Sequence, residues 1–176
     1  TVTDPNGCSS SRSIVVAASE IANINEVLIE GGNTYNTVTI LVSGAGDYEY
    51  ALDDPFEGFQ NEPYFENVPA GIHTIYVKDK FGCGTASLEI SIIGFPRFFT
   101  PNNDGYNDTF DLKGIEFYGT SEVYIFNRYG KLLKSTKNSP FSWNGTFNNK
   151  VLPTSDYWYL IRIDNSEFKG SFTLKR

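Results

Sequence analysis

The residues best suited to chemistry lie in one short loop, residues 102–108, with the sequence NNDGYND. Side-chain oxygens recur at alternate positions, and Gly105 permits a sharp turn. Calcium prefers several such oxygens within one tight loop. The full EF-hand pattern and its late bidentate Glu are absent, and Asn/Asp/Gly loops also form hydrogen-bonded turns without metal. Both alternatives stay open, and the candidate calcium ligands are Asn102, Asp104, Asn107, Asp108 and the carbonyl of Tyr106.

Catalytic chemistry has little support in the sequence. His73 is the only histidine, and it precedes an apolar run, so a structural role is expected. Asp53 and Asp54 are sequence neighbours beside Pro55 and are expected to be solvated turn residues, because catalytic carboxylate pairs face each other across a cleft. One His and two Cys are too few for a four-ligand zinc site, and no nucleophile elbow or phosphate loop occurs. We therefore predict that the chain is not an enzyme.

The two cysteines occupy matching positions of an internal repeat. Residues 2–8 (VTDPNGC) match residues 77–83 (VKDKFGC), and both copies predict a hairpin with Gly in its turn. Residues 1–18 are then either the last hairpin of a preceding module or the first strands of this one. A disulfide between Cys8 and Cys83 is one prediction, which export would permit, and the alternative is that the two do not pair with each other.

Composition favours β-sheet and divides the chain into two parts. Of 176 residues, 14 are Phe and 11 are Tyr, and ring side chains suit a pleated, half-buried surface. Residues 1–94 hold 3 basic and 13 acidic residues, whereas residues 95–176 hold 11 basic and 8 acidic residues. This break predicts domains at 1–94 and 95–176, and the acidic half argues against nucleic-acid binding. No apolar run reaches the ~20 residues of a membrane helix, and no signal peptide stands at residue 1, so we expect the end of a longer, non-spanning polypeptide.

Short alternating runs predict the strands. In the first half these runs lie at 26–30, 37–42, 47–52, 64–68 and 73–77, and residues 86–93 complete the second hairpin. In the second half they lie at 95–100, 109–113, 122–127, 141–146, 156–163 and 168–176. No convincing amphipathic helix appears. The predicted fold is all-β, with two consecutive immunoglobulin-like β-sandwich domains.

Five motifs in the second half carry a family resemblance. They are FPRFFTPNNDGYNDTF (95–110), IFNRYGKLL (125–133), WNGT (143–146), LPTSDYWY (152–159) and FKGSFTLKR (168–176). In this order they resemble the gliding-motility-associated C-terminal domain, the type B sorting domain of the type IX secretion system in Bacteroidota. Asn103 and Asn144 depart from the common Gly and Asp of that family. Residues 20–94 are similar to the immunoglobulin-like modules that precede this domain in SprB-type gliding adhesins.

The resemblance implies a sorting and anchoring role. The C-terminal domain would be read by the type IX translocon, and it would then hold the protein at the cell surface through an outer-membrane β-barrel of the PorP/SprF type. An aromatic-rich domain and a terminal strand are compatible with such docking. Alternate residues of that strand must also fill the domain's own core, so a structural role is the first expectation for Phe168, Phe172 and Leu174, whereas Lys175 and Arg176 cannot be explained as core. Trp143 and Trp158 are expected in the core, with a docking face as the alternative. The candidate recognition residues are Phe168, Lys169, Gly170, Phe172, Leu174, Lys175 and Arg176.

Two other functions compete with this interpretation. A carbohydrate-binding β-sandwich would use exposed aromatics such as Tyr48, Tyr50 or Tyr64, and a flat aromatic platform would favour it. A structural spacer would suit residues 1–94, but it leaves the motifs after Phe95 without a role.

Overall fold

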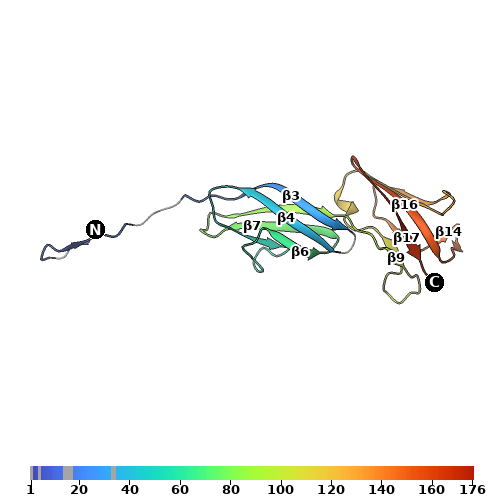
Figure 1. Cartoon of the computed structure of the whole chain (residues 1–176), viewed down its shortest axis with the longest axis horizontal. Coiled ribbons are helices and arrows are strands. Elements are labelled where there is room, and N and C mark those ends of the chain that lie inside the picture. The colour runs from blue at the N-terminus through green and yellow to red at the C-terminus, as the bar shows by residue number, and fades with distance from the viewer. Residues whose placement is uncertain (1, 4, 14–17, 33–34) are drawn as a thin grey trace.

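The structure is a computed structural model that describes residues 2–3, 5–13, 18–32 and 35–176. It is built from strands and one short 3-10 helix, η1 (Ile115–Phe117). A small hairpin, β1 (Val2–Thr3) with β2 (Ser9–Ser10), lies at one end of the molecule, followed by two β-rich units in a row (Figure 1). The all-β class predicted from the sequence is confirmed. No helix in the described part of the chain is long and apolar enough to cross a membrane.

The N-terminal unit is a sandwich of two three-stranded antiparallel sheets. One sheet has the order β3-β4-β6, formed by Asn23–Gly32, Tyr35–Ser43 and Tyr64–Val68. The other has the order β5-β7-β8, formed by Tyr48–Leu52, Gly71–Asp79 and Thr85–Ile92. Side chains alternate across a strand, so β4 and β7 each direct one apolar row inward. The resulting core is mostly aliphatic: Ala22, Val38, Ile40, Tyr50, Val68, Ile75, Val77, Ile90 and Ile92.

The C-terminal unit is organised around one five-stranded sheet with the order β12-β11-β16-β17-β9. Its strands are Leu132–Lys137, Ser121–Phe126, Ser155–Ile163, Ser166–Leu174 and Phe98–Phe99, and only the β17–β9 pair is parallel. Short pieces cover the inner face of this sheet. They are η1 and the pair β10 (Phe110–Asp111) and β13 (Ser142–Trp143), which supply Ile115, Phe110 and Trp143 to the core. A separate pair is formed by β14 (Thr146–Phe147) and β15 (Lys150–Val151). The run predicted at 95–100 thus forms only a two-residue strand.

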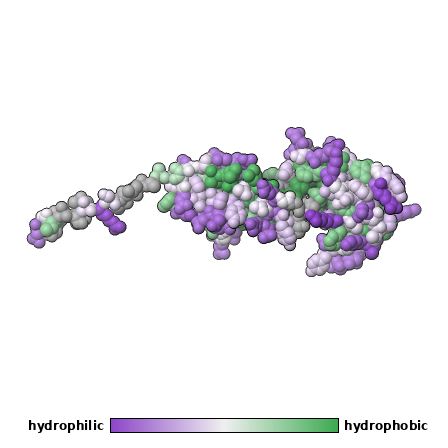
Figure 2. All heavy atoms as spheres, viewed as in Figure 1, coloured by the Kyte–Doolittle hydropathy of each residue, from purple (hydrophilic) through white to green (hydrophobic). Residues whose placement is uncertain are grey.

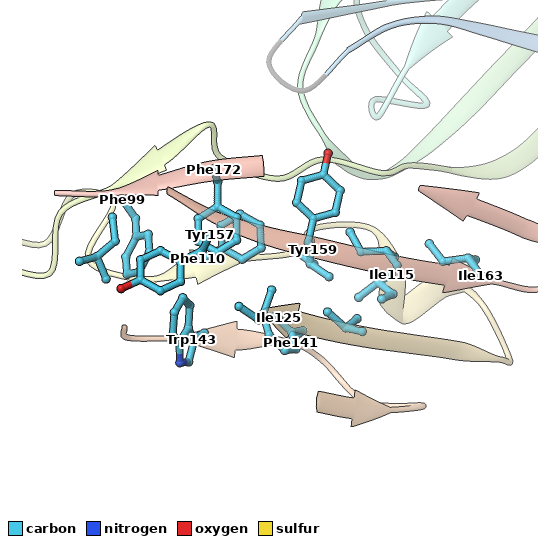
Figure 3. Close-up of a cluster of buried hydrophobic side chains, with 14 residues drawn as sticks. Phe99, Phe110, Ile115, Ile125, Phe141, Trp143, Tyr157, Tyr159, Ile163 and Phe172 are labelled. Carbon is cyan, nitrogen blue, oxygen red and sulfur yellow. The ribbon is translucent and has the colours of Figure 1, made fainter. Parts of the chain in front are cut away.

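Aromatic rings fill the space between that sheet and its short cover (Figure 3). Phe110 stacks on Phe172 with ring centroids 3.8 Å apart, and Trp143 contacts Phe172 edge-on at 5.9 Å. Trp143 also donates its indole N–H to the carbonyl of Thr146, so its polar edge is satisfied inside the core. The core position expected for Trp143 is therefore the one observed.

The two units meet without a free linker. Ser91 donates its hydroxyl to the carbonyl of Gly114 at 2.7 Å, and Gly94 and Lys113 exchange two backbone hydrogen bonds. Ile92 belongs to the aliphatic core, whereas its neighbour Ile93 packs against the aromatic core. The predicted domain limit at 94/95 stays a prediction, because consecutive residues serve both cores.

Candidate functional site

The last strand, β17, has one face in the core. Phe172 and Leu174 are almost fully buried there and pack in the domain's own core. Gly170 points to the same side, where a β-carbon would overlap the Tyr159 hydroxyl group. Phe168 is 39% exposed at the far end of this face. Of these four candidate recognition residues, the folded domain presents only Phe168 to solvent as a large side chain.

The chain end folds back onto the domain. Arg176 donates its Nε–H to the carbonyl of Leu152 at 3.0 Å and a terminal N–H to the carbonyl of Gly145 at 3.3 Å. Its backbone N–H donates to the Thr154 hydroxyl at 2.9 Å. Arg176 thus fastens two loops from separate motifs of the sequence. Arg176 was named as a recognition residue from the sequence, and these hydrogen bonds give it a structural role as well.

The final residues of β17 do not form an open sheet edge. β9 runs beside them in parallel, and Thr173 and Lys175 donate their N–H groups to the carbonyls of Arg97 and Phe99. Lys175 lies over the Phe98 ring at 4.7 Å, and Lys169 pairs with Glu167. A partner strand could therefore add only beside the earlier residues of β17, which β9 does not reach.

The loop at 102–108 closes on its own backbone. Asp108 accepts N–H groups from Asn102 and Asn103 on Oδ1, at 3.0 and 2.6 Å, and from Gly105 on Oδ2 at 2.8 Å. Asp104 accepts the N–H of Tyr106 and the side-chain amide of Asn102. These donors lower the pKa of Asp104 below its usual value, the Tyr106 N–H most of all. Gly105 and Asn103 both adopt the left-handed conformation that this tight turn needs.

This hydrogen bonding bears on the predicted calcium site. Each carboxylate oxygen of Asp104 and Asp108 already accepts at least one N–H group, and Asn102 Oδ1 accepts the N–H of Asp104. A cation would have to replace these donors, so the geometry fits a hydrogen-bonded turn better than a metal cage. Within the described ranges, no cluster of three or more His, Cys, Asp or Glu residues is arranged to hold a metal. Calcium remains a prediction.

The two cysteines do not form the predicted disulfide in this structure. Cys8 is exposed in the turn of the distal β1–β2 hairpin, and Cys83 is exposed in the β7–β8 turn. The repeated motif has a visible role in its second copy. Asp79 accepts the N–H of Cys83 and the hydroxyl of Ser19, which ties the start of the unit to that turn. Asp4, the matching residue in the first copy, lies outside the described residues.

His73 has the structural role expected of it. It is buried, with Nδ1 at 2.7 Å from Asp53 Oδ2 and Nε2 at 2.9 Å from the carbonyl of Pro69. Asp53 also accepts the N–H of Thr74, so it is an anchor and not merely a solvated turn residue as predicted. Asp54 caps the N–H groups of two following residues. The group ties the loop after β5 to the turn between β6 and β7.

The three tyrosines named for the competing carbohydrate-binding hypothesis do not form an aromatic platform. Tyr50 is buried in the N-terminal core, and burial raises the pKa of its phenol. Tyr48 is half-buried, with its hydroxyl bonded to the backbone of Glu20 and Gly46. Of these three tyrosines, only Tyr64 is exposed. A groove of about 680 Å³ does lie near the 102–108 loop, between Pro69 and Ala70 on one side and residues 94–98 on the other, but it contains none of these tyrosines.

The outer face of the five-stranded sheet holds residues that sequence reasoning did not group, and among them is Trp158, for which the expectation of a core position was wrong. Cross-strand partners share a face, so the register aligns Tyr124 with Leu160, and Phe126 with both Trp158 and Leu132. Trp158 is 42% exposed, Leu132 is 44% exposed, and the rings of Tyr124 and Phe126 stack. We call these five residues the outer stripe. In β16, apolar residues at both odd and even positions were the available signal.

Paired charges border the outer stripe on one side. Lys137, Glu122, Arg162 and Glu167 follow one another across four strands, and ion pairs of 2.6 to 3.8 Å connect them and Lys169. Lys137 lowers the pKa of Glu122, and Lys169, followed by Arg162, lowers the pKa of Glu167. Both carboxylates are therefore charged at neutral pH. We call this row the charge ladder.

Comparison with known families now identifies the C-terminal unit. Residues 93–174 match the family described as CHU_C Type IX secretion signal domain. Those residues are a type IX secretion signal domain, and the chain carries a sorting signal for that secretion system. The matched range coincides with the aromatic core, the five-stranded sheet and the 102–108 loop. The domain thus implies interaction with the secretion machinery and export.

Comparisons over the whole chain are weaker. Dimeric latent PorU from Porphyromonas gingivalis is similar at 14% identity and a TM-score of 0.32, over 87% of this chain and 20% of that one. The BSP domain of a biofilm-associated protein aligns at 10% identity and a TM-score of 0.32, over 86% of this chain and 29% of that one. The chain spans only a fifth to a third of these structures, and at these scores they carry no argument. No curated protein matches the sequence.

Proposed function

We propose that this chain is the C-terminal end of a cell-surface adhesin, and that its last domain both directs export and anchors the protein. The observation that carries the proposal is the type IX secretion signal domain at residues 93–174. The anchor would be an outer-membrane β-barrel of the PorP/SprF type. The chain would stay attached to that barrel after passing the translocon.

The N-terminal unit suits the adhesin part of the proposal. It is an immunoglobulin-like sandwich, a fold that often serves as one module in a row. The repeated hairpin motif at residues 2–8 and 77–83 supports a row of related modules. The hydrogen bonds between the N-terminal unit and the signal domain would hold such a row of modules at a fixed angle to its anchor.

A surface-display experiment tests export and anchoring separately. A fluorescent protein with an export leader is fused to residues 1–176, or to residues 1–92 as the matched control, in a gliding Bacteroidota host. We expect surface fluorescence only from the longer fusion, and none in a host that lacks the translocon. In a host that lacks the PorP/SprF-type barrel, the longer fusion should move from the cell surface to the medium. Unchanged surface attachment there would refute barrel anchoring while leaving export intact.

A further inference from the structure

The outer stripe is unusual for its position. An antiparallel sheet with one face in the core normally presents polar side chains on its other face. Here the inner face of β16 carries Tyr157, Tyr159 and Ile161, and its outer face still carries Trp158 and Leu160. The inner residues account for the core, and none of the five residues of the outer stripe belongs to it. Trp158 is exposed and Tyr124 and Phe126 are half-buried beside it, and aromatic side chains on a rigid sheet are the kind that dominates protein interfaces.

The charges around the outer stripe are arranged unevenly. On one side stands the charge ladder, whose members neutralise one another. At the opposite end lie Arg128 and Lys131 in the β11–β12 turn, and Lys175 over the Phe98 ring. None of these three cations takes part in an ion pair within the described part of the chain; each lies over an aromatic ring. One carboxylate, Asp156, lies near them and accepts the Thr173 hydroxyl.

We propose that the outer stripe and the cations at its end form the docking surface of the signal domain, and that its occupant is a protein of the secretion or anchoring machinery with an apolar patch bordered by carboxylates. The proposal rests on the proposed function, because it names the surface that the machinery contacts. It moves recognition from the terminal strand, whose large residues are in the core, to the outer face of β11, β12 and β16. The aromatic residues supply contact area, and the cations orient the partner.

A lipid surface is the competing occupant, because Trp, Tyr and Lys also gather at membrane interfaces. The charge ladder argues against it. Glu122 and Glu167 lie on the same face as the outer stripe, and their ion pairs keep them charged. A membrane that covered the stripe would also have to accommodate this row of paired charges and displace its water, whereas a protein partner can end at the edge of the ladder.

The test uses the 1–176 fusion with three changes. Trp158→Thr with Phe126→Thr removes the aromatic centre and keeps good strand formers. Arg128→Glu with Lys175→Glu reverses the charge at the end of the stripe. Leu41→Thr is the matched control, because Leu41 is also 42% exposed on a strand, but in the N-terminal unit. Each purified variant must keep the wild-type denaturation midpoint within error, which separates docking from folding.

We expect the aromatic pair to lower cell-surface attachment about thirtyfold, the loss typical of a central interface residue, and the charge pair to lower it about tenfold. Leu41→Thr should match the wild type. If both double variants, Trp158→Thr with Phe126→Thr and Arg128→Glu with Lys175→Glu, attached like the wild type, the proposed docking surface would be wrong and the proposed function would be unaffected. Absence of export for the wild-type fusion itself would overturn both. Binding of the wild type, but not the aromatic pair, to protein-free vesicles of phosphatidylethanolamine and phosphatidylglycerol would overturn the protein partner in favour of lipid.

Discussion

The two units of this chain solve the same packing problem with different side chains. The N-terminal unit has two sheets of equal size, and aliphatic residues such as Ile40 and Ile75 fill the gap between them. The C-terminal unit has only one large sheet, covered by two-residue strands and one helical turn. Because these short elements supply few side chains to the core, each of those side chains must be large. A core of Phe, Tyr and Trp is the consequence of an incomplete second layer.

The largest loss of stability is expected from a substitution at the centre of the aromatic core. Phe110 is fully buried and stacks on Phe172, so Phe110→Ala should reduce the unfolding free energy of the C-terminal unit by about 3–5 kcal/mol. Both tryptophans lie in this unit, and tryptophan fluorescence during urea unfolding therefore reports on it selectively. Ile40→Val, the control in the aliphatic core, should cost about 0.5–1.5 kcal/mol and leave the fluorescence transition in place. If the two substitutions lowered the unfolding free energy equally, the stability of the C-terminal unit would not depend on large core side chains more than that of the N-terminal unit.

The second prediction concerns the loop that the chain end clasps. Gly145 has φ +75°, and a β-carbon there would overlap Leu174 Cδ1 and lie 3.2 Å from the Phe99 ring. Gly145→Ala should therefore destabilise the C-terminal unit by about 2–4 kcal/mol, through backbone strain and overpacking together. Gly82→Ala is the matched control, because φ is +88° there and no atom lies within 4 Å of the added carbon. It should cost about 1–2 kcal/mol, in the N-terminal unit only.

A smaller loss of stability is expected from removing the Arg176 side chain, which holds the two loops. Arg176→Ala removes the side-chain hydrogen bonds to the carbonyls of Leu152 and Gly145, which should cost about 1–2 kcal/mol in the fluorescence transition. Lys175→Ala removes only an exposed contact with the Phe98 ring, for about 0.5–1 kcal/mol. If Arg176→Ala left stability unchanged but abolished export, the terminal cation would be a recognition residue after all.

The smallest effect is a difference in acid sensitivity. Ser19 and the N–H of Cys83 hold the pKa of Asp79 below its ordinary value of 3.8. The stabilisation is thus complete above that value and is lost as the pH falls through the lower, folded-state pKa. Asp79→Asn should make the stability of the N-terminal unit, followed by circular dichroism between pH 5 and 2.5, less dependent on pH. The fluorescence transition of the C-terminal unit should keep its own acid dependence, which Glu122 and Glu167 supply.

The sequence predicted strands well where one face of the strand is buried and the other is exposed to solvent. β4 alternates in this way, and the run predicted at 37–42 lies within it. It was less informative at residues 95–100, where Pro96 and a parallel partner distant in sequence reduce the strand to Phe98–Phe99. The helical turn η1 has too few residues for a periodic signal.

The candidate site shows the same limit. Alternation alone favoured a structural role for Phe172 and Leu174, and the structure places them in the core. The clasp of Arg176 depends on loops 22 to 31 residues away, and no local pattern reports such a contact. The outer stripe depends on the register of β11, β12 and β16, since a one-residue slip would place Trp158 in the core.

The junction at residues 91–94 has a mechanical consequence. The chain enters the N-terminal unit at the end near the distal hairpin and leaves it through β8 at the end that meets the signal domain (Figure 1). If the signal domain is held and the far end is pulled, tension runs along β3 and β8, at right angles to the hydrogen bonds that join them to β4 and β7. Those bonds then share the load in shear and do not open one at a time. Apolar side chains along β3 and β4 stay exposed on this unit (Figure 2), so its resistance to force would come from backbone pairing and not from a covered outer face.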